Sequence, residues 1–515
     1  MLSALDYIVI VVYLIGVAAL GISLGGRQRS TDDYFLGGRN LPWWAVCFSV
    51  VATETSTLTI IGVPAVAYGG TMTFLQITAG YLVGRIAVSL LFLPRYFKGA
   101  MSTAYAYLGE RFGDRMRSTA SVTFMVTRLL ADGVRLFATA IPLKVIADSA
   151  GLTVMGDPIS YGQIILLLGI ITVIYTLVGG IRAVIWIDVV QMGLYILGGV
   201  LCTVLLFDGL PEGAMTLAAM EGKLRVIDFG LGGSFNDWIT QPYVTVTAII
   251  GGGVFSMASH GTDQLIVQRL LTCRTLRDSQ YALVGSAVLV ALQFALFLAI
   301  GTLLWVHYGG VTPAELGLSR GDEVFPRYII EGLPAGLSGL LLAGILAAAM
   351  STLSSSLNSL ASSSMMDLIE RWIKNPISKA RGLLLSRGLT LFWGALFVVF
   401  ASLFENTDNP VVELGLAIAS FTYGGLLGGF LLGIVIKNAK EWDAVTAFIL
   451  TIVVMVLVIF GLWHSPTEGW IFAINPTDGM IEQAGLRQIA WPWYTLIGSV
   501  ICVFVGFLLS LRHKR

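Results

Sequence analysis

The chain has 515 residues, of which 56% are hydrophobic and 12% are charged, whereas an average soluble domain has roughly 25% charged residues. Together with a mean hydropathy of +0.83, this composition excludes a chain built mainly of soluble domains. The formal net charge is +0, so the chain as a whole does not attract a polyanion, and we expect no nucleic-acid partner.

The predicted elements are membrane-spanning helices, because crossing a bilayer takes about 20 mostly apolar residues whose backbone groups bond within the helix. The first segment has no basic run before it and no small-residue cleavage site after it, so we expect a retained span and not a signal peptide. Thirteen segments meet the criterion. Their approximate ranges are 5 to 26, 42 to 67, 72 to 97, 118 to 146, 160 to 179, 183 to 207, 241 to 268, 280 to 306, 332 to 366, 385 to 404, 411 to 436, 443 to 463 and 492 to 511.

Basic residues predict the orientation of these spans, since short cytoplasmic loops are enriched in Lys and Arg. Of the 31 Lys and Arg residues, 22 lie in the loops of one side, and Arg182 and Arg269 are among them. Six lie in the opposite loops, and Arg85, Arg128 and Arg135 fall within spans. We therefore expect a multi-pass protein of the inner (plasma) membrane, with the N-terminus outside and the C-terminus in the cytoplasm.

Two spans that lie five apart in chain order contain interruptions. The span at 42 to 67 has Thr-Glu-Thr-Ser-Thr at 53–57, and the span at 241 to 268 has three glycines at 251–253 and Ser-His-Gly at 259–261. Because five is an odd number, a repeat that relates the two spans is inverted in the membrane, and paired broken helices of this kind are typical of a midplane transport site. The alternative is that these small residues only let neighbouring helices pack closely.

Several charged residues lie within the early spans. Arg135 is able to bind a carboxylate through two parallel hydrogen bonds, but Arg85 and Arg135 could instead pair with Glu54 and Asp132 and hold the bundle together. His260 beside the second interruption either takes up a proton or stays neutral and hydrogen-bonded.

Asp188 lies about one and a half turns into the sixth span. A carboxylate at that depth costs at least about 2.5 kcal/mol unless it is paired or binds an ion. Asp188 is therefore either an ion ligand or part of a salt bridge, to Arg182 or to a neighbouring span.

The ninth span carries a run of hydroxyl side chains at 351–359. Positions 351, 355, 358, 359 and 362 recur at helical spacing and form one polar stripe. Sodium is a hard cation that prefers oxygen ligands, which hydroxyls and unwound carbonyls supply. The alternative is that these hydroxyls only bond back to carbonyls one turn earlier.

The cysteines and histidines are scattered along the chain and show no spacing typical of a disulfide framework or a zinc site. There is also no Ser/His/Asp arrangement or Gly-rich phosphate loop placed to support catalysis. We therefore expect a transporter and not an enzyme.

From about residue 34 to residue 437 the sequence resembles the sodium:solute symporter family, which includes carriers of sugars, proline, sialic acid and iodide. The resemblance implies an all-α polytopic membrane protein of the LeuT type, with two inverted five-helix repeats. The motifs that carry it, in order, are DYFLGGR at 33–39, LPWW at 41–44, YTLVGGI at 175–181, DQ at 263–264, VQR at 267–269 and the serine run of the ninth span.

The same resemblance implies a division of the chain. An extra helix and a cytoplasmic loop occupy 1–41, and the transport core occupies 42–437. Its repeats are 42–207 and 241–437. Two extra helices occupy 438–515.

The family's widespread sodium site corresponds to five positions of this sequence. It would use the main-chain carbonyls of Ala52, Thr55 and Ala348 and the hydroxyls of Ser351 and Thr352. We expect sodium ions as the coupling partner.

The resemblance also implies a second sodium site and a substrate site next to the first. The second sodium site corresponds to Asp188, Ser351, Ser354 and Ser355. The substrate positions are Ser56, Thr59, Gln76, Thr78, Ser256 and Ser259, to which Arg135 is added for its charge. Family members that carry sugars have an Asn and a gating Tyr where this chain has Ser256 and Ser259, which argues against a hexose.

The sequence thus predicts sodium-coupled symport of a small organic solute, such as a carboxylate or an amino acid, by alternating access in a lipid bilayer. We expect a monomer. One alternative is a proton-coupled carrier on the same fold, in which Asp188 or Glu54 titrates. Another is a membrane sensor whose transporter-like domain reports solute binding.

Overall fold

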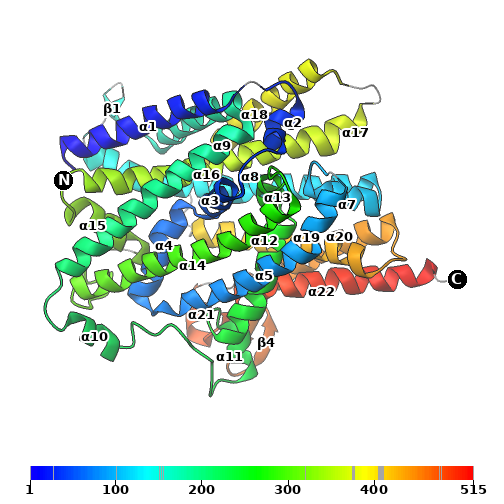
Figure 1. Ribbon diagram of the computed structural model, residues 1–515. Helices are drawn as coiled ribbons and strands as arrows, with labels where there is room; N and C mark the ends of the chain where they lie inside the picture. The colour runs from blue at the N-terminus through cyan, green and yellow to red at the C-terminus, as the bar shows by residue number, and fades with distance from the viewer. Residues whose placement is uncertain are drawn as a thin grey trace.

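The structure is a computed structural model that describes residues 2–513 except 27, 100, 150, 152, 155, 319, 374–376, 404–410, 475 and 477. The chain forms a bundle of helices, and its two ends lie at opposite ends of the bundle (Figure 1). The helices that build the spans are α1 (Ala4–Leu24), α3 (Trp43–Glu54), α4 (Thr57–Gly69), α5 (Ile77–Leu91), α6 (Leu93–Lys98), α8 (Asp114–Ser149), α9 (Tyr161–Asp208), α12 (Gly252–Gly261), α13 (Gln264–Leu270), α14 (Leu276–His307), α16 (Leu337–Ser363), α18 (Lys379–Ser402), α19 (Val411–Val435), α20 (Glu441–Gly461) and α22 (Trp491–Ser510).

Shorter elements connect these helices. The short α-helices are α2 (Thr31–Leu36), α7 (Ala104–Arg111), α10 (Ala214–Met220), α11 (Phe235–Thr240), α15 (Val324–Glu331), α17 (Glu370–Trp372) and α21 (Asp478–Ala484). The 3-10 turns are Gly37–Arg39, Met72–Gln76, Gly321–Glu323 and Leu511–His513, and π-helical turns occur at Thr247–Gly251 and Ser364–Ile369. Strand β1 (Thr153–Val154) pairs antiparallel with β2 (Asp157–Pro158), and β3 (Leu462–Ser465) lies between β4 (Gly469–Phe472) and β5 (Arg487–Gln488).

Each of the thirteen predicted spans coincides with helix in the structure. By length and composition alone, eight described helices are able to cross a membrane, or up to nine when the bent pair α3 and α4 counts as one span. The count is lower partly because α9, with 48 residues, contains two helices joined at a kink at Gly180 and is counted once. α9 therefore supplies two spans.

The two spans of α9 meet at Gly180, whose φ of 58° and ψ of −163° lie in a region that is open almost only to glycine. A Cβ atom on Gly180 would lie 2.7 Å from the carbonyl oxygen of Tyr34, so a larger residue would also collide with the backbone of α2. Tyr175 and Ile187, on either side of Gly180, both lie against Gly21 of α1, so the chain reverses its direction at this turn. The boundary predicted between the spans at 160 to 179 and 183 to 207 coincides with the turn, and Arg182 lies two residues after it, at the start of the second helix.

The predicted interruption of the second span is confirmed. Helix α3 ends at Glu54, α4 begins at Thr57, and the two axes differ by 67°. Thr55 has an extended backbone, with φ of −78° and ψ of 111°, and Ser56 is the N-cap of α4. The chain is thus unwound for two residues inside the bundle.

The predicted interruption of the seventh span is right at one place and wrong at the other. The glycines at 251–253 do not break the helix, because the π-helical turn Thr247–Gly251 runs directly into α12. They allow close packing instead, since a Cβ atom on Gly84 of α5 would lie 2.3 Å from the carbonyl oxygen of Gly253. The break comes after Gly261, where Asp263 caps α13.

The serine-rich helix α16 lies at the centre of the bundle, among α3, α8 and α9 (Figure 1). All residues from Leu341 to Ser363 are buried. Buried hydroxyls need partners, and several of these serines bond to other helices: for example, Ser351 donates to Asp188 of α9 and Ser356 to Asp132 of α8. Outer helices such as α14 and α22 expose apolar side chains instead, as lipid-facing helices do.

Candidate functional site

The break between α3 and α4 lies against the middle of α16. On one side of it, the Thr53 and Ser355 hydroxyl oxygens are 3.2 Å apart. On the other side, the Thr57 hydroxyl donates to the Ile345 carbonyl oxygen at 3.4 Å. The unwound residues between these two contacts therefore run along the part of α16 that carries the predicted sodium ligands.

The structure brings the two halves of the predicted first sodium site together at this place. Ala52 and Ala348 are both fully buried in the same apolar cluster. Ser351 and Thr352 follow one turn later on α16, and the Thr352 hydroxyl donates to the Ala348 carbonyl oxygen at 3.1 Å. Thr55 is the first residue beyond the end of α3.

The end of α3 explains why carbonyl oxygens are offered here. The last carbonyls of a helix have no intrahelical partner. The Ser56 N–H, which would bond to the Ala52 carbonyl if the helix continued, donates to the Thr59 hydroxyl at 3.3 Å. Uncharged oxygens at a helix end suit a hard monovalent cation. The arrangement therefore offers a cation mainly uncharged oxygens, and the Asp188 carboxylate lies next to one of them, the Ser351 hydroxyl.

Asp188 is held by an arginine that the sequence analysis placed in a cytoplasmic loop. The nearest nitrogen of Arg269 lies 3.3 Å from Asp188 Oδ2, and both side chains are fully buried. Ser49 and Ser351 donate to the same carboxylate at 2.5 and 2.6 Å. Of the two alternatives, the structure shows the salt bridge, and its partner is Arg269 of α13 instead of Arg182.

The other members of the predicted second sodium site lie beside this ion pair. The Ser354 and Ser355 hydroxyls donate to the Ser351 carbonyl oxygen at 3.0 and 2.6 Å, as in the back-bonding alternative. Arg269 also makes a short hydrogen bond to the Ser355 hydroxyl. A guanidinium thus occupies the position next to Asp188 in this conformation.

The burial of Arg269 and its pairing with Asp188 were not predicted, because Arg269 lies in a charged segment just after a helix break. The visible signal was the VQR motif, which belongs to the family resemblance. The side chain is buried because α13 turns back into the bundle after Gly261, and its Gln264 and Gln268 bond to Ser362 and Asn358 of α16.

A small cavity opens beside the unwound residues. Its volume is about 10 Å³, which leaves room for the centre of about one water molecule. Two predicted substrate residues and one predicted sodium ligand line it together: Ser56, Arg135 and Thr352. The predicted substrate and sodium positions therefore meet at this cavity.

Arg135 is anchored on one side and borders the cavity on the other. One of its nitrogens lies 3.2 Å from Asp132 Oδ1, and its side chain is 23% exposed whereas that of Asp132 is 1% exposed. Asp132 in turn pairs with Arg128, and Arg128 pairs with Asp263 at 2.8 Å. Part of the guanidinium remains available to a ligand.

Glu54 pairs with Arg85 at 2.5 Å, as the second alternative for these charges anticipated. Arg85 also donates to Ser286 of α14 at 2.5 Å. The His260 Nε2 atom lies 3.5 Å from Glu54, and its Nδ1 atom is hydrogen-bonded to Ser259. The cluster ties the end of α3 to α5, α12 and α14.

Five of the predicted substrate residues have partners elsewhere, and none of them is among the described side chains that line the cavity. On α12, Ser256 donates to the Tyr81 carbonyl and Ser259 to the Ser256 carbonyl. Close to the start of α5, Gln76 donates to the Tyr243 carbonyl and Thr78 to the Leu75 carbonyl. Thr59 takes part in the N-terminal cap of α4.

A connected group of aromatic rings was not predicted, because its members lie far apart in the sequence. Phe255 of α12 lies at the centre, with ring centroids 6.2 Å from Tyr81, 5.6 Å from Tyr423 and 5.1 Å from Trp491. Tyr423 also bonds to Arg128 at 2.5 Å. These rings connect α5, α12, α19 and α22 beside the charged network.

Known proteins resemble this chain over most of its length. The sequence profile of the Sodium:solute symporter family matches residues 34–453. The sodium/sialic acid symporter NanT of Aliivibrio fischeri is 29% identical, over 100% of this chain and 94% of that protein. The sodium/sialic acid symporter SiaT of Proteus mirabilis is 30% identical, over 89% and 90%. The human sodium/iodide cotransporter is 30% identical, over 84% and 66%.

Two solved structures share the fold. A Na+-coupled sialic acid symporter in a substrate-bound outward-open state has a TM-score of 0.82 and 26% identity, and the match covers 99% of this chain and 98% of that one. The transporter MHP1 of the nucleobase-cation-symport-1 family, in a closed conformation, has a TM-score of 0.54 and 15% identity, over 94% of both chains. The second likeness concerns the fold alone.

These comparisons confirm the predicted fold class, an all-α polytopic membrane protein of the LeuT type, and a multi-pass location in the membrane. They also confirm sodium as the coupling ion and transport instead of enzyme activity. The match covers well over half of the chain and contains both broken helices and the serine-rich helix. The chain belongs to the sodium:solute symporter family.

Proposed function

We propose that this carrier couples sodium entry to the uptake of a small organic solute that has a carboxylate group, either an organic acid or an amino acid, by alternating access. The observation that supports this proposal is the position of Arg135, a partly exposed guanidinium at the cavity that Ser56 and Thr352 also line. The solutes named for the relatives, sialic acid and iodide, are both anions. Arginine is well suited to bidentate carboxylate recognition.

Sodium would bind at the main-chain carbonyls of Ala52, Thr55 and Ala348 and the hydroxyls of Ser351 and Thr352. An ion at these positions would join the unwound residues to α16 and favour the conformation that binds substrate. The membrane potential contributes about 2.3 kcal/mol per charge per 100 mV, so even one sodium ion supports substantial accumulation. With basic loops facing the cytoplasm, the N-terminus would be outside.

A second sodium site at Asp188, Ser351, Ser354 and Ser355 remains part of the proposal. It requires Arg269 to move away from Asp188 at some point of the cycle, because the guanidinium lies there in this structure. The proposal therefore links a second ion to a movement of α13.

Arg135 and Ser56 would contact the substrate first. Thr59, Gln76, Thr78, Ser256 and Ser259 would approach it in another conformation. The repeats at 42–207 and 241–437 would move relative to each other, with 1–41 and 438–515 as added segments. The carrier would act as a monomer and would bind no nucleic acid.

Proton coupling has less support. Asp188 and Glu54, the carboxylates that a proton-coupled carrier would titrate, both pair with arginine here. A solute sensor on the same fold would bind its ligand without net transport.

The test is uptake in proteoliposomes with sodium or potassium outside, with small carboxylates, amino acids and neutral sugars as candidates. We expect uptake of one acidic class that requires inward-directed sodium. Uptake driven by a proton gradient in potassium would support the rival carrier, and sodium-dependent binding without uptake would support the sensor.

A further inference from the structure

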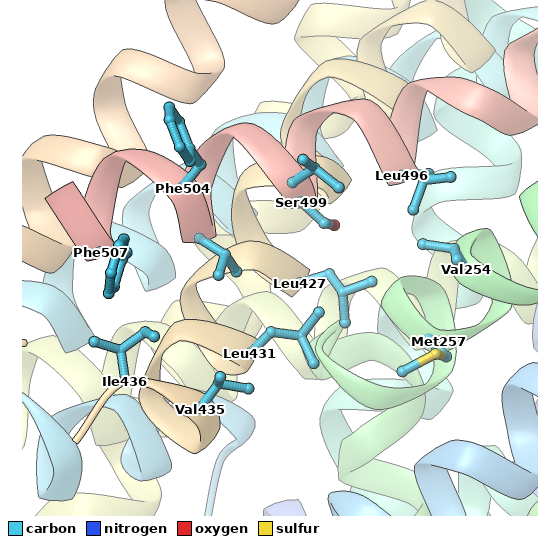
Figure 2. Close-up of a pocket in the computed structure, with 12 residues that line it drawn as sticks. Val254, Met257, Leu427, Leu431, Val435, Ile436, Leu496, Ser499, Phe504 and Phe507 are labelled. Atoms are coloured by element: carbon cyan, nitrogen blue, oxygen red, sulfur yellow. The ribbon is translucent and has the colours of Figure 1, made fainter.

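A long apolar groove runs along the outside of the bundle between α19 and α22. Figure 2 shows α19 and α22 as its two sides, with α12 at one end beside Leu496 and the other end open beside Ile436 and Phe507. Its volume is about 440 Å³. The groove lies away from the polar site between α3, α8 and α16.

The floor of the groove is formed where α19 and α22 approach each other closely. A Cβ atom on Gly424 would lie 2.7 Å from the Cα atom of Gly498, and one on Gly428 would lie 2.3 Å from the Cβ atom of Cys502. Leu431 of α19 and Val503 of α22, which lie close to these contacts in the sequence, both line the groove.

The lining offers nothing to a polar ligand. Eleven of the twelve lining residues are apolar, and the twelfth is Ser499. The Ser499 hydroxyl already donates to the Thr495 and Gly424 carbonyls at 2.7 and 3.3 Å. The side chains at the open end are exposed, with Val435 at 61% and Phe504 at 59%. An occupant of this groove is apolar.

The length of the groove matches one leaflet of a bilayer. Leu496 and Phe507 on α22 are eleven positions apart, or about 16 Å along the helix axis. Half of the hydrocarbon core is about 15 Å thick. The groove extends from the depth of α12 to the membrane surface at which α19 and α22 end.

Basic residues stand at the open end. Lys437 directly follows the lining residue Ile436 and is exposed, as is Lys440. The Arg512 side chain is 60% exposed, although one of its nitrogens bonds to Asp443, which is itself 1% exposed. The other acidic residue in the first turn of α20, Glu441, accepts from the Arg115 N–H at 2.8 Å. The exposed charge at this end is therefore mainly positive.

We propose that the groove binds one acyl chain of an anionic phospholipid, with its phosphate at Lys437 and Arg512 and its methyl end against Val254 and Met257 of α12. The orientation proposed above places this lipid in the cytoplasmic leaflet, where anionic headgroups attract basic residues close to the surface. Because α12 also carries Ser256 and Ser259, which belong to the proposed substrate residues, the lipid would touch a helix that contributes to the proposed transport site.

The experiment uses the full chain in phosphatidylcholine nanodiscs. Each preparation contains a small fraction of a lipid with a photoreactive group on one acyl chain, and this probe lipid is either phosphatidylglycerol or phosphatidylcholine. Cross-linked peptides are mapped by mass spectrometry. Leu431→Trp fills the groove, and Leu292→Trp is its control on the exposed face of α14. Lys437→Gln removes a proposed headgroup contact, and Lys379→Gln, at the start of α18, is its control. Each variant is first checked for a wild-type elution profile and melting temperature.

We expect cross-links to concentrate on α12, α19 and α22, with phosphatidylglycerol preferred about fivefold for each basic residue involved. We expect Leu431→Trp to abolish these cross-links and Leu292→Trp to leave them unchanged. We expect Lys437→Gln to lower the preference for phosphatidylglycerol and Lys379→Gln to leave that preference unchanged. Uniform labelling of the outer surface, or equal labelling by the two lipids, would overturn the proposal. So would a dimer that protects the groove from both lipids, because the occupant would then be a second copy of the chain.

Discussion

Asp188 on α9 and Arg269 on α13 form an ion pair in which both side chains are fully buried. The pair joins the two sequence repeats that we propose, since α9 ends the first and α13 belongs to the second. Ser49 strengthens the link, because Arg269 donates to its hydroxyl at 2.9 Å while Ser49 donates to Asp188. The ion pair therefore connects α3, α9 and α13.

Replacing one member of this pair leaves a buried charge without its partner, which typically costs about 3–5 kcal/mol. We expect Arg269→Gln to lower the melting temperature of the purified carrier strongly. The double variant Arg269→Gln with Asp188→Asn recovers part of the loss, because no net charge remains buried. An Arg269→Gln variant as stable as the wild type would show that the pair does not form in the membrane.

The first sodium site is tested by removing one hydroxyl. Hydrogen bonds and contacts to a charged group are worth about 1.5–3 kcal/mol, so we expect Thr352→Ala to raise the sodium concentration for half-maximal uptake by about tenfold or more. Ser359→Ala is a matched control, since its hydroxyl donates to the Ser356 carbonyl of the same helix at 3.1 Å. Sodium-dependent uptake is measured in proteoliposomes, and unchanged sodium dependence in Thr352→Ala would remove this residue from the site.

The second sodium site predicts cooperativity. If Asp188 binds an ion during the cycle, uptake depends on sodium with a Hill coefficient above one, and Asp188→Asn brings the coefficient close to one. Sodium titrations of uptake at saturating substrate measure it. A wild-type coefficient in Asp188→Asn would assign Asp188 to the salt bridge alone.

Arg135 is expected to hold the carboxylate of the substrate. Arg135→Gln removes the charge, whereas Arg135→Lys keeps the charge but loses the planar arrangement of donors. We expect Arg135→Gln to weaken substrate binding by about tenfold or more, with a smaller loss in Arg135→Lys and little change in sodium binding. Thermal stabilisation by substrate in the presence of sodium reports on this. An equal loss of sodium-induced stabilisation would indicate a purely structural role.

Close packing of α5 and α12 depends on Gly84. Because an added Cβ atom would lie 2.3 Å from a backbone oxygen, Gly84→Ala must separate the two helices, and overpacking of this kind typically costs about 1–3 kcal/mol. Gly193→Ala on α9 is the control, since nothing lies within 4 Å of its added Cβ atom. We expect a lower melting temperature and slower uptake for Gly84→Ala alone. Equal behaviour of the two variants would contradict the packing described here.

The features that were predictable from the sequence are those set by the bilayer or by local spacing. The span at 5 to 26 follows from the length of an apolar run, and the break at Thr55 and Ser56 from polar residues within such a run. The polar stripe that contains Ser351 follows from helical spacing within one helix. Each of these signals is contained in one short segment of the chain.

The features that were missed depend on segments far apart in the sequence. Arg269 lies in a basic stretch typical of a loop, and only the return of α13 into the bundle buries it beside Asp188. In the sequence, the glycines at 251–253 look like a helix break. In the structure, they allow α5 to pack closely against α12.

The turn at Gly180 limits which parts of the carrier can move separately. The two helices of α9 meet there and both pack against Gly21 of α1, through Tyr175 and Ile187, so a displacement of one helix moves the other. The chain is unwound at Thr55 and Ser56 and again at Thr262 and Asp263. Opening and closing of the solute pathway is therefore expected to use these two joints as hinges, while α1 and the two helices of α9 move together as one packed unit.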